Sequence, residues 1–239
     1  MTALRLLVTR PEPEATRSAD ALRAKGHDVM VAPMLNFEPT RDAVLGAGPW
    51  AGVLLTSANA ARAIAQHAQF AALKDLPVLA VGDRTADVAR EFGFGDVTSA
   101  AGDANALARV AAARFAGAQA TLLYAAAEQR AVDLAEMLAP AGVRVRTTVV
   151  YRMAKQSVFP VNVAVALKAG TLDGVLHYSR RSAEAYLDCV AALGGHAPAP
   201  MHYCLSADVA KPLTAAGTDR IHIALRPDEP ALFDLLTLA

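Results

Sequence analysis

Short apolar runs alternate along the chain with longer segments in which apolar residues recur at helical spacing. The apolar runs include LRLLV, GVLLT, VLAVG, TLLY and GVLHY, and alanine-rich segments such as ATRSADALRAK and NAARAIAQHA follow them. Strands that alternate with amphipathic helices are typical of parallel sheets covered by helices. Because the apolar runs are continuous, we expect both faces of each strand to be buried. The pattern therefore predicts an α/β fold.

The same pattern occurs twice. RLLVTRPEPEATRSADALRAKGHDVMVAPMLNFEP lies over TLLYAAAEQRAVDLAEMLAPAGVRVRTTVVYRMAK, so that Gly26 matches Gly142 at a displacement of 116 (142 − 26). AGVLLTSANAARAI matches DGVLHYSRRSAEAY with Ser57 on Ser179, and VGDRTADVAREFG matches LSADVAKPLTAAG with Gly93 on Gly217. Such duplication predicts two lobes of similar fold. The matched glycines follow helical segments, where positive φ would end each helix.

The order of the repeated pieces suggests how the lobes are divided. Each copy of the first piece ends in an extended tail, at 34–40 and at 149–156. If both tails are crossovers that pair as an antiparallel ladder, lobe one is 1–33 with 157–239 and lobe two is 41–148. Two lobes in series, cut near residue 116, are the alternative, and periodicity alone does not decide between the two arrangements.

The amino-acid composition limits the kinds of partner that the chain is expected to bind. Hydrophobic residues make up 54% of the 239 residues, but every apolar stretch is interrupted well before membrane-spanning length, so no membrane partner is expected. The N-terminus has no secretory pattern, and Cys189 and Cys204 have no metal or redox spacing, which favours a cytoplasmic protein with reduced, buried thiols. With 23 basic and 23 acidic residues, the chain lacks the broad positive field of a nucleic-acid-binding protein, so nucleic acid is not expected as a partner.

Candidate binding residues follow the predicted strands. In open parallel sheets, ligands bind beyond the carboxyl ends of the strands, where helix N-termini present free amides. The residues expected there to bind an anion are Thr9, Arg10, Ser57, Ala58, Asn59, Thr85, Arg130, Ser179, Arg180, Arg181 and Ser206. Each hydroxyl could instead serve as a helix N-cap, and each arginine could be a solvated surface residue. We expect the loops of both lobes to face one cleft and to hold a large polyanion.

Familiar catalytic signatures are absent from the sequence. It contains no G-x-S-x-G elbow, no Walker loop and no G-x-G-x-x-G, and its six histidines lack metal-ligand spacing. We therefore expect neither a cofactor nor a metal. Tyr151, in the second tail, is the candidate hydrogen-bond donor or general acid, although it could equally be a strand aromatic.

An ordered set of motifs gives the chain a family resemblance. LLVTRPEPEA, GVLLTSANA, AVGDRTADVAREFG, VVYR and LHYSRRSAEAY together resemble the uroporphyrinogen-III synthase family over nearly the whole chain. The resemblance implies two flavodoxin-like lobes joined by a two-stranded β ladder. It also implies a cytoplasmic, monomeric lyase of tetrapyrrole (porphyrin and heme) biosynthesis. Such an enzyme closes the linear tetrapyrrole hydroxymethylbilane to uroporphyrinogen III, with loss of water and inversion of ring D, without a cofactor.

The resemblance also implies residue roles. Tyr151 matches the tail tyrosine that assists departure of the hydroxyl, while Thr9, Ser57, Thr85 and Ser179 with neighbouring amides would hold carboxylates. In LHYSRRSAEAY, Arg180 or Arg181 stands where many members have small polar residues, and we expect one of them to touch a propionate. LSADVA at 205–210 departs from the G-x-T-T-A-like loop of the family, since Ser206 replaces the glycine and Val209 a threonine.

Two other functions are compatible with parts of the pattern. A non-catalytic two-lobed binder of a small anion would use the same amide donors. A tandem phospho-receiver pair would need a phosphorylatable aspartate in an acidic pocket, and Asp83, the nearest candidate, has no acidic partners in the sequence.

Overall fold

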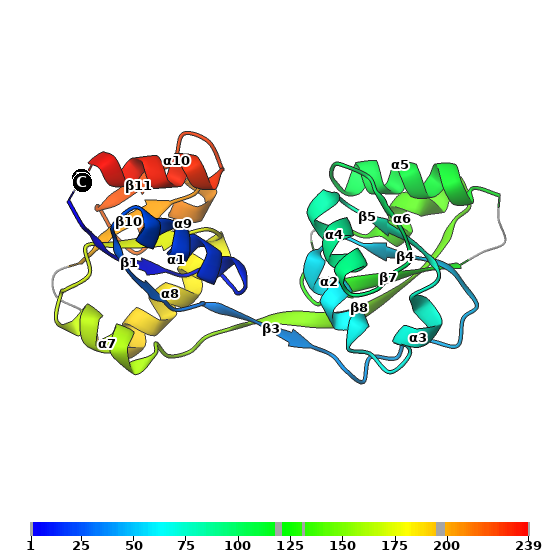
Figure 1. Cartoon of the computed structure of the whole chain (residues 1–239), viewed down its shortest axis with the longest axis horizontal. Helices are drawn as coiled ribbons and strands as arrows, with labels where there is room; N and C mark the ends of the chain where they lie inside the picture. The colour runs from blue at the N-terminus through cyan, green and yellow to red at the C-terminus, as the bar shows by residue number, and fades with distance from the viewer. Residues whose placement is uncertain (1, 118–120, 131, 195–198, 239) are drawn as a thin grey trace. The chain divides into compact units, whose positions relative to one another are not determined.

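The computed structural model describes residues 2–117, 121–130, 132–194 and 199–238, and the chain divides into two compact units. Unit 1 comprises Met1–Asn36 and Ala154–Ala239, and unit 2 comprises Phe37–Met153. The chain thus leaves unit 1 early and returns to it late, as the colours of Figure 1 show.

Unit 1 is built on a parallel sheet with the strand order β11-β10-β9-β1-β2. This is the flavodoxin-like order, in which the first strand of the chain lies inside the sheet. The strands and helices are β1 (Arg5–Val8), α1 (Glu14–Ala24), β2 (Asp28–Val31), α7 (Val161–Lys168), β9 (Gly174–His177), α8 (Arg180–Ala192), β10 (Met201–Cys204), α9 (Ala207–Ala215), β11 (Ile221–Ile223), α10 (Glu229–Asp234) and the 3-10 helix η2 (Leu235–Leu238).

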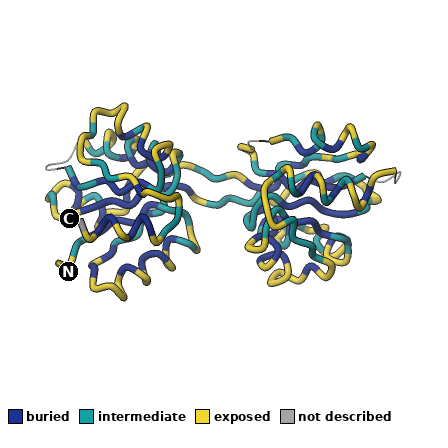
Figure 2. Tube along the Cα trace, turned by 90° about the horizontal axis from the view of Figure 1, so that it is seen from above, coloured by how far each residue is buried: buried dark blue, intermediate teal, exposed yellow. Residues whose placement is uncertain are grey.

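Helices cover both faces of this sheet. Leu6 and Val8 pack with residues of α1 and α10, whereas Leu7 between them packs with residues of α7 and α8 on the other face. The side chains of Leu6, Leu7 and Val8 are fully buried. Consecutive strand residues point to opposite faces, so an uninterrupted apolar strand requires two apolar layers. Figure 2 shows the buried strands and the exposed outer sides of the helices.

Unit 2 repeats this plan. Its sheet has the order β3-β8-β7-β4-β5-β6, and β8 to β6 are mutually parallel. The elements that lie in unit 2, or mostly in it, are β3 (Leu35–Pro39), β4 (Trp50–Leu55), α2 (Ala58–Ala65), α3 (Phe70–Leu73), β5 (Pro77–Ala80), α4 (Asp83–Glu91), β6 (Asp96–Ser99), α5 (Ala104–Phe115), β7 (Thr121–Ala127), α6 (Leu134–Leu138), the 3-10 helix η1 (Ala139–Ala141) and β8 (Arg144–Lys155).

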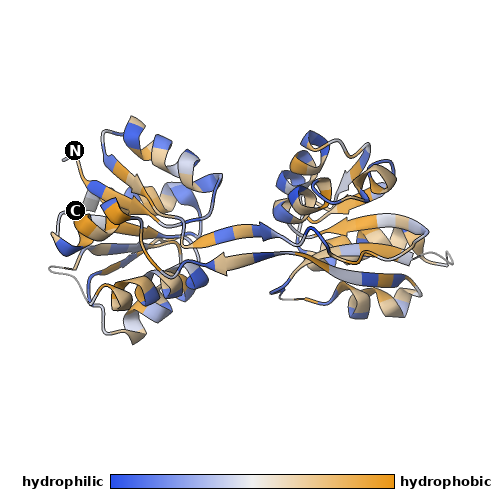
Figure 3. Ribbon diagram, turned by 90° about the horizontal axis from the view of Figure 1, so that it is seen from below, coloured by the Kyte–Doolittle hydropathy of each residue, from blue (hydrophilic) through white to orange (hydrophobic). Residues whose placement is uncertain are grey.

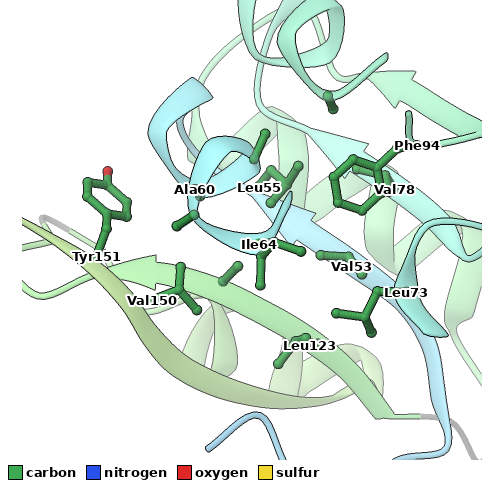
Figure 4. Packing of buried hydrophobic residues seen from close by; sticks show 14 of the residues in the cluster. Val53, Leu55, Ala60, Ile64, Leu73, Val78, Phe94, Leu123, Val150 and Tyr151 are labelled. Carbon is green, nitrogen blue, oxygen red and sulfur yellow. The ribbon is translucent and has the colours of Figure 1, made fainter. Parts of the chain in front are cut away.

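The unit 2 core also has two layers. Val53 and Leu55 of β4 pack with Ile64 of α2 on one face, in the cluster drawn in Figure 4. On the other face, Leu54 packs against Leu107 of α5. The alternation along β4 again places neighbouring residues in opposite layers, so both faces of the sheet are sealed from water.

The two sheets confirm the internal duplication. β8-β7-β4-β5-β6 has the arrangement of β2-β1-β9-β10-β11, and the matched strands are those that the sequence repeat pairs. The matched glycines Gly26 and Gly142 have φ values of 92° and 70°, and each follows a helical segment as expected. The predicted fold class, two parallel α/β sheets with a two-stranded β connection, is confirmed.

The second tail is not separate from the strand that precedes it. β8 is a single strand of 12 residues, which begins beside β7 and ends at Lys155. β3 lies next to β8 and runs in the opposite direction (Figure 3). Just past the end of β3, the Thr40 amide donates to the Val150 carbonyl at 2.8 Å.

Two buried tyrosines allow a stability test of the core. Tyr186 has a buried hydroxyl with no hydrogen-bond partner among the described residues, whereas the Tyr124 hydroxyl lies 3.1 Å from Thr56 Oγ1. Removing an unsatisfied buried hydroxyl relieves a desolvation cost, while removing a satisfied one leaves its partner unpaired. We expect Tyr186→Phe to leave the urea midpoint unchanged or raise it. Tyr124→Phe should lower stability by about 1 kcal/mol. The reverse ranking of the two variants would contradict the assignment of an unpaired hydroxyl to Tyr186 and a paired one to Tyr124.

Candidate functional site

Ser57 and Tyr151 meet at the carboxyl edge of the unit 2 sheet. Ser57 follows β4 as the N-cap of α2, and its Oγ accepts a hydrogen bond from the Ala60 amide at 3.3 Å. The Tyr151 hydroxyl lies 2.8 Å from the same Oγ. The N-cap role that the sequence left open for Ser57 is therefore realised, and the same oxygen also holds the phenol.

A β-bulge explains how Tyr151 reaches this position. The pairing of β7 with β8 shifts between Ala126 and Ala127, so that Val150 is an extra residue on β8. Val150 and Tyr151 consequently bury against the same cluster, and Phe37 lies against the tyrosine ring with centroids 5.6 Å apart. A bulge commonly re-aims a side chain beside a functional site. Tyr151 is 6% exposed, and Figure 4 shows its hydroxyl directed away from the labelled aliphatic side chains.

The first turn of α2 carries the other two residues expected at this edge. Ala58 begins the helix, and Asn59 follows it. Asn59 donates to Met153 Sδ at 3.4 Å and accepts from Arg62 at 2.7 Å. The contact between Asn59 and Met153, like that between Ser57 and Tyr151, therefore connects the start of α2 with β8.

Two further unit 2 residues have different settings. Thr85 lies within α4 rather than in the preceding loop, because the helix begins at Asp83 with Gly82 as its N-cap. Its side chain is buried. Arg130 is exposed in the segment after β7, where it lines a hollow with Glu128, so a carboxylate is already present beside it.

In unit 1, the loop after β9 places Ser179 at the start of α8. Ser179 is the N-cap, and its Oγ accepts from the Ser182 amide at 3.1 Å. Arg180 is exposed and forms an ion pair with Glu184 at 3.1 Å, one turn further along the helix. Arg181 is half-buried in the same first turn. Ser179 thus has the same cap geometry as Ser57, its partner in the sequence repeat.

Thr9 and Ser206 also lie at this edge of unit 1. Thr9 is fully buried, and its hydroxyl donates to the Leu176 carbonyl at 2.7 Å, which joins the ends of β1 and β9. Ser206 is the N-cap of α9 and accepts from the Val209 amide at 3.4 Å. Both hydroxyls therefore make contacts within unit 1.

Arg10 lies in a polar cluster of unit 1 rather than alone in solvent. Its guanidinium donates to Glu229 at 2.9 Å and to Ser18 at 3.1 Å, and it lies 4.4 Å above the Tyr178 ring. Ser18 also makes a short hydrogen bond to Glu229. Burial raises the pKa of the Tyr178 phenol, which therefore stays neutral. The cluster ties the loops after β1 and β9 to the start of α10.

A buried histidine pair in unit 1 had no signal in the residue spacing. His177 Nε2 lies 3.0 Å from His202 Nδ1, and the ring of Tyr186 lies 5.1 Å from that of His177. His177 ends β9, two residues before Ser179. The six histidines showed no common spacing, and the two come together only because β9 and β10 are neighbours.

The described residues contain no group of His, Cys, Asp or Glu that could hold a metal ion, and His196 lies outside them. Within that same part of the chain, no helix is long and apolar enough to cross a membrane.

These features define a class: an α/β protein of two flavodoxin-like units with hydroxyl-capped helices at the carboxyl edges of both sheets. The family model described as Uroporphyrinogen-III synthase HemD matches residues 16–234, and the chain belongs to this family.

Solved structures with the same fold support the architecture. The uroporphyrinogen-III synthetase from Helicobacter pylori 26695 matches with a TM-score of 0.67 at 16% identity, over 100% of both chains. A mutant uroporphyrinogen III synthase from the extremely thermophilic bacterium Thermus thermophilus matches with a TM-score of 0.53 at 14% identity, over 99% of this chain and 98% of the other. No curated protein sequence gives a significant match.

Because His177 of this pair is buried, we expect the free energy of unfolding to depend on pH. His177 is fully buried, and burial, with a smaller effect of His202, holds its pKa well below the usual value of 6.5. The unfolded state therefore binds the proton more readily, so stability is complete above that value and falls as the pH decreases below it. We expect a loss approaching about 1.4 kcal/mol per pH unit.

Urea denaturation between pH 8 and 5 measures this slope, and His177→Gln provides the comparison. The variant should show a flatter dependence on pH, even if it is less stable throughout. An unchanged slope would show that His177 does not bind the proton on unfolding.

Proposed function

We propose that this chain is a uroporphyrinogen-III synthase, which closes hydroxymethylbilane to uroporphyrinogen III with inversion of ring D and loss of water. The family match over residues 16–234 supports the reaction class. The proposed mechanism rests on the hydrogen bond of 2.8 Å between the Tyr151 hydroxyl and Ser57 Oγ. It brings a phenol, a serine hydroxyl and a helix N-terminus together at one sheet edge, in the part of a parallel sheet where ligands bind.

Tyr151 is the proton donor in this proposal. Since Ser57 Oγ accepts from the Ala60 amide, its own hydroxyl hydrogen is available to donate to the Tyr151 oxygen. In this proposal the phenol then donates its hydrogen to the substrate. This relay begins at the positive end of α2, which stabilises negative charge developing on the phenol oxygen.

The chemistry needs one proton at one oxygen. The ring A hydroxyl takes the proton and leaves as water, which produces an azafulvenium cation. The substituted carbon of ring D attacks this cation, and the resulting spiro intermediate fragments and closes again in the inverted orientation. The proton lost from the product during aromatisation restores the phenol, so no net proton is consumed.

Backbone amides supply much of the carboxylate binding in this proposal. The substrate carries four acetates and four propionates, while the protein has a net charge of zero. The first turns of α2 and α8, capped by Ser57 and Ser179, each present amides at the carboxyl edge of a sheet. A helix N-terminus binds an anion without any charged side chain.

The isomer of the product decides between the enzyme and a non-catalytic binder. Hydroxymethylbilane closes spontaneously to the type I isomer, without inversion. Incubation with the purified chain, followed by oxidation and chromatographic separation of the porphyrins, should yield type III. Type I alone, at the spontaneous rate, would contradict the proposed activity and leave the binder as the remaining candidate.

Replacing Tyr151 tests the proton donor. Tyr151→Phe retains the ring contact with Phe37 but lacks the hydroxyl, and we expect turnover to fall by about 100-fold, which is typical of a lost general acid. Ser57→Ala should lower turnover less, because it loosens the phenol without removing it. Tyr203→Phe, a buried tyrosine of β10, is the control and should retain the rate. Wild-type rate and isomer ratio in Tyr151→Phe would reject this role.

Charge reversal tests the two arginines of the α8 first turn. R180E/R181E should raise the KM for hydroxymethylbilane at least about tenfold, since it replaces charge-assisted bonds with repulsion. R23E/K25E, at the C-terminal end of α1 and therefore at the opposite end of that helix from this edge, makes the same change in net charge and should leave the KM unchanged. Equal KM values for the two double variants would exclude a specific contact by Arg180 or Arg181.

A further inference from the structure

The amino edge of the unit 2 sheet carries a hollow that the proposed reaction does not use. It has a volume of about 810 Å³, and its walls come from the start of β4, the start of β7, the start of β8 and the segment 46–49. The helix capped by Ser57 follows the carboxyl end of β4, at the opposite edge of the same sheet. The hollow is therefore separate from the candidate functional site within unit 2.

Strand register places three side chains of the hollow in one row. Trp50 of β4 pairs with Thr121 of β7, and Thr121 pairs with Arg144 of β8. Residues in register on parallel neighbours point to the same face of a sheet, and Arg146, two positions after Arg144, shares that face. An indole, a hydroxyl and two guanidinium groups thus line one hollow.

The lining of the hollow is positively charged. Arg144 and Arg146 are both exposed, and no Asp or Glu is among the described residues that line the hollow. Arg146 donates to the Val44 carbonyl at 3.4 Å, a contact that leaves its charge in place. In a protein with no net charge, such a local concentration of arginine favours an anion.

The segment before β4 holds the guanidinium and the indole close together. A Cβ atom on Gly46 would lie 3.2 Å from Arg146 Nε and 3.2 Å from Trp50 Cζ2. Gly46 also has a φ of 101°, so a side chain there would be strained as well as crowded. The glycine thus permits both side chains to approach the backbone at the rim of the hollow.

These groups specify a ligand chemistry. Two arginines at alternate positions of a strand have Cα atoms about 6.6 Å apart, and guanidinium groups bind carboxylates and phosphates through charge-assisted hydrogen bonds. The half-buried indole offers a flat apolar surface against which a ring can stack. An anion with both an acidic edge and a flat ring would use both parts of the hollow.

We infer that this hollow is a second binding site, for an organic anion that carries at least two acidic groups on a flat ring system. The site belongs to unit 2 alone and does not depend on the proposed synthase activity. Its acidic groups are carboxylates or phosphates, since both fit the guanidinium pair.

The indole N–H signal of Trp50 reports binding directly, because the chain contains one tryptophan. The full chain is titrated with benzenetetracarboxylate in one arm and with ADP in the other, followed by proton–nitrogen correlation spectra. We expect at least one of the two to shift the indole signal saturably. The uncharged benzenetetracarboxamide should not shift it.

Matched variants locate the site. R144Q/R146Q should weaken binding of the active probe at least about tenfold, since two charge-assisted contacts are lost. R109Q/R114Q removes the same charge from α5 of the same unit, none of whose described residues lines the hollow, and should bind as the wild type does. Failure of both anions to shift the indole signal, or equal affinity in the two double variants, would overturn the inference. Isomer analysis of R144Q/R146Q should still give the wild-type product ratio, so this result is independent of the proposed reaction.

Discussion

Burial of both faces of each parallel sheet is the constraint on which the remaining features depend. Because helices cover the apolar residues of β1 and β4 on either side, ligands can reach the strands only at their two ends. Carboxyl ends lead into helix N-termini, which attract anions, and the hydroxyl-capped helices lie there. Amino ends offer no such amides, so the hollow beside Trp50 relies on arginine side chains instead.

The duplication explains why the two units resemble each other. The side chains at the carboxyl edges of their sheets nevertheless differ. Ser57 and Ser179 occupy equivalent positions and cap their helices in the same way. Among the described residues, a tyrosine lies against the hydroxyl of Ser57 but not against that of Ser179, because β8 continues beyond the position where the equivalent β2 ends and bulges toward α2. In unit 1, the corresponding edge is joined by Thr9 and Arg10 to neighbouring segments. The proposed proton donor therefore belongs to unit 2, whereas the proposed binding groups occur in both units.

Hydrophobic periodicity and the internal repeat were sufficient to predict two α/β lobes with parallel sheets, since burial and helix termination depend on local sequence. The flavodoxin-like lobes and the two-stranded connection were expected from the family resemblance. The positive φ of Gly26 and Gly142 is an example, because a residue without a side chain ends a helix at low cost. Helix starts were less predictable: Thr85 lies inside α4, since Gly82 takes the N-cap position.

Contacts between residues that are distant along the chain could not be predicted from the sequence. The meeting of His177 with His202 depends on the neighbouring positions of β9 and β10, and the contact of Ser57 with Tyr151 depends on one extra residue in β8. Neither has a signature in residue spacing. The resemblance to the family pointed to Tyr151, but the serine partner and the bulge that aims the phenol emerge only in three dimensions.

Hydrogen–deuterium exchange in the presence of the product uroporphyrinogen III shows whether the carboxyl edges of the sheets bind the tetrapyrrole. If they do, the amides at 57–60 and 179–182, at the starts of α2 and α8, exchange more slowly when the product is bound. Unchanged exchange at both segments, at a product concentration that saturates the protein, would contradict such binding.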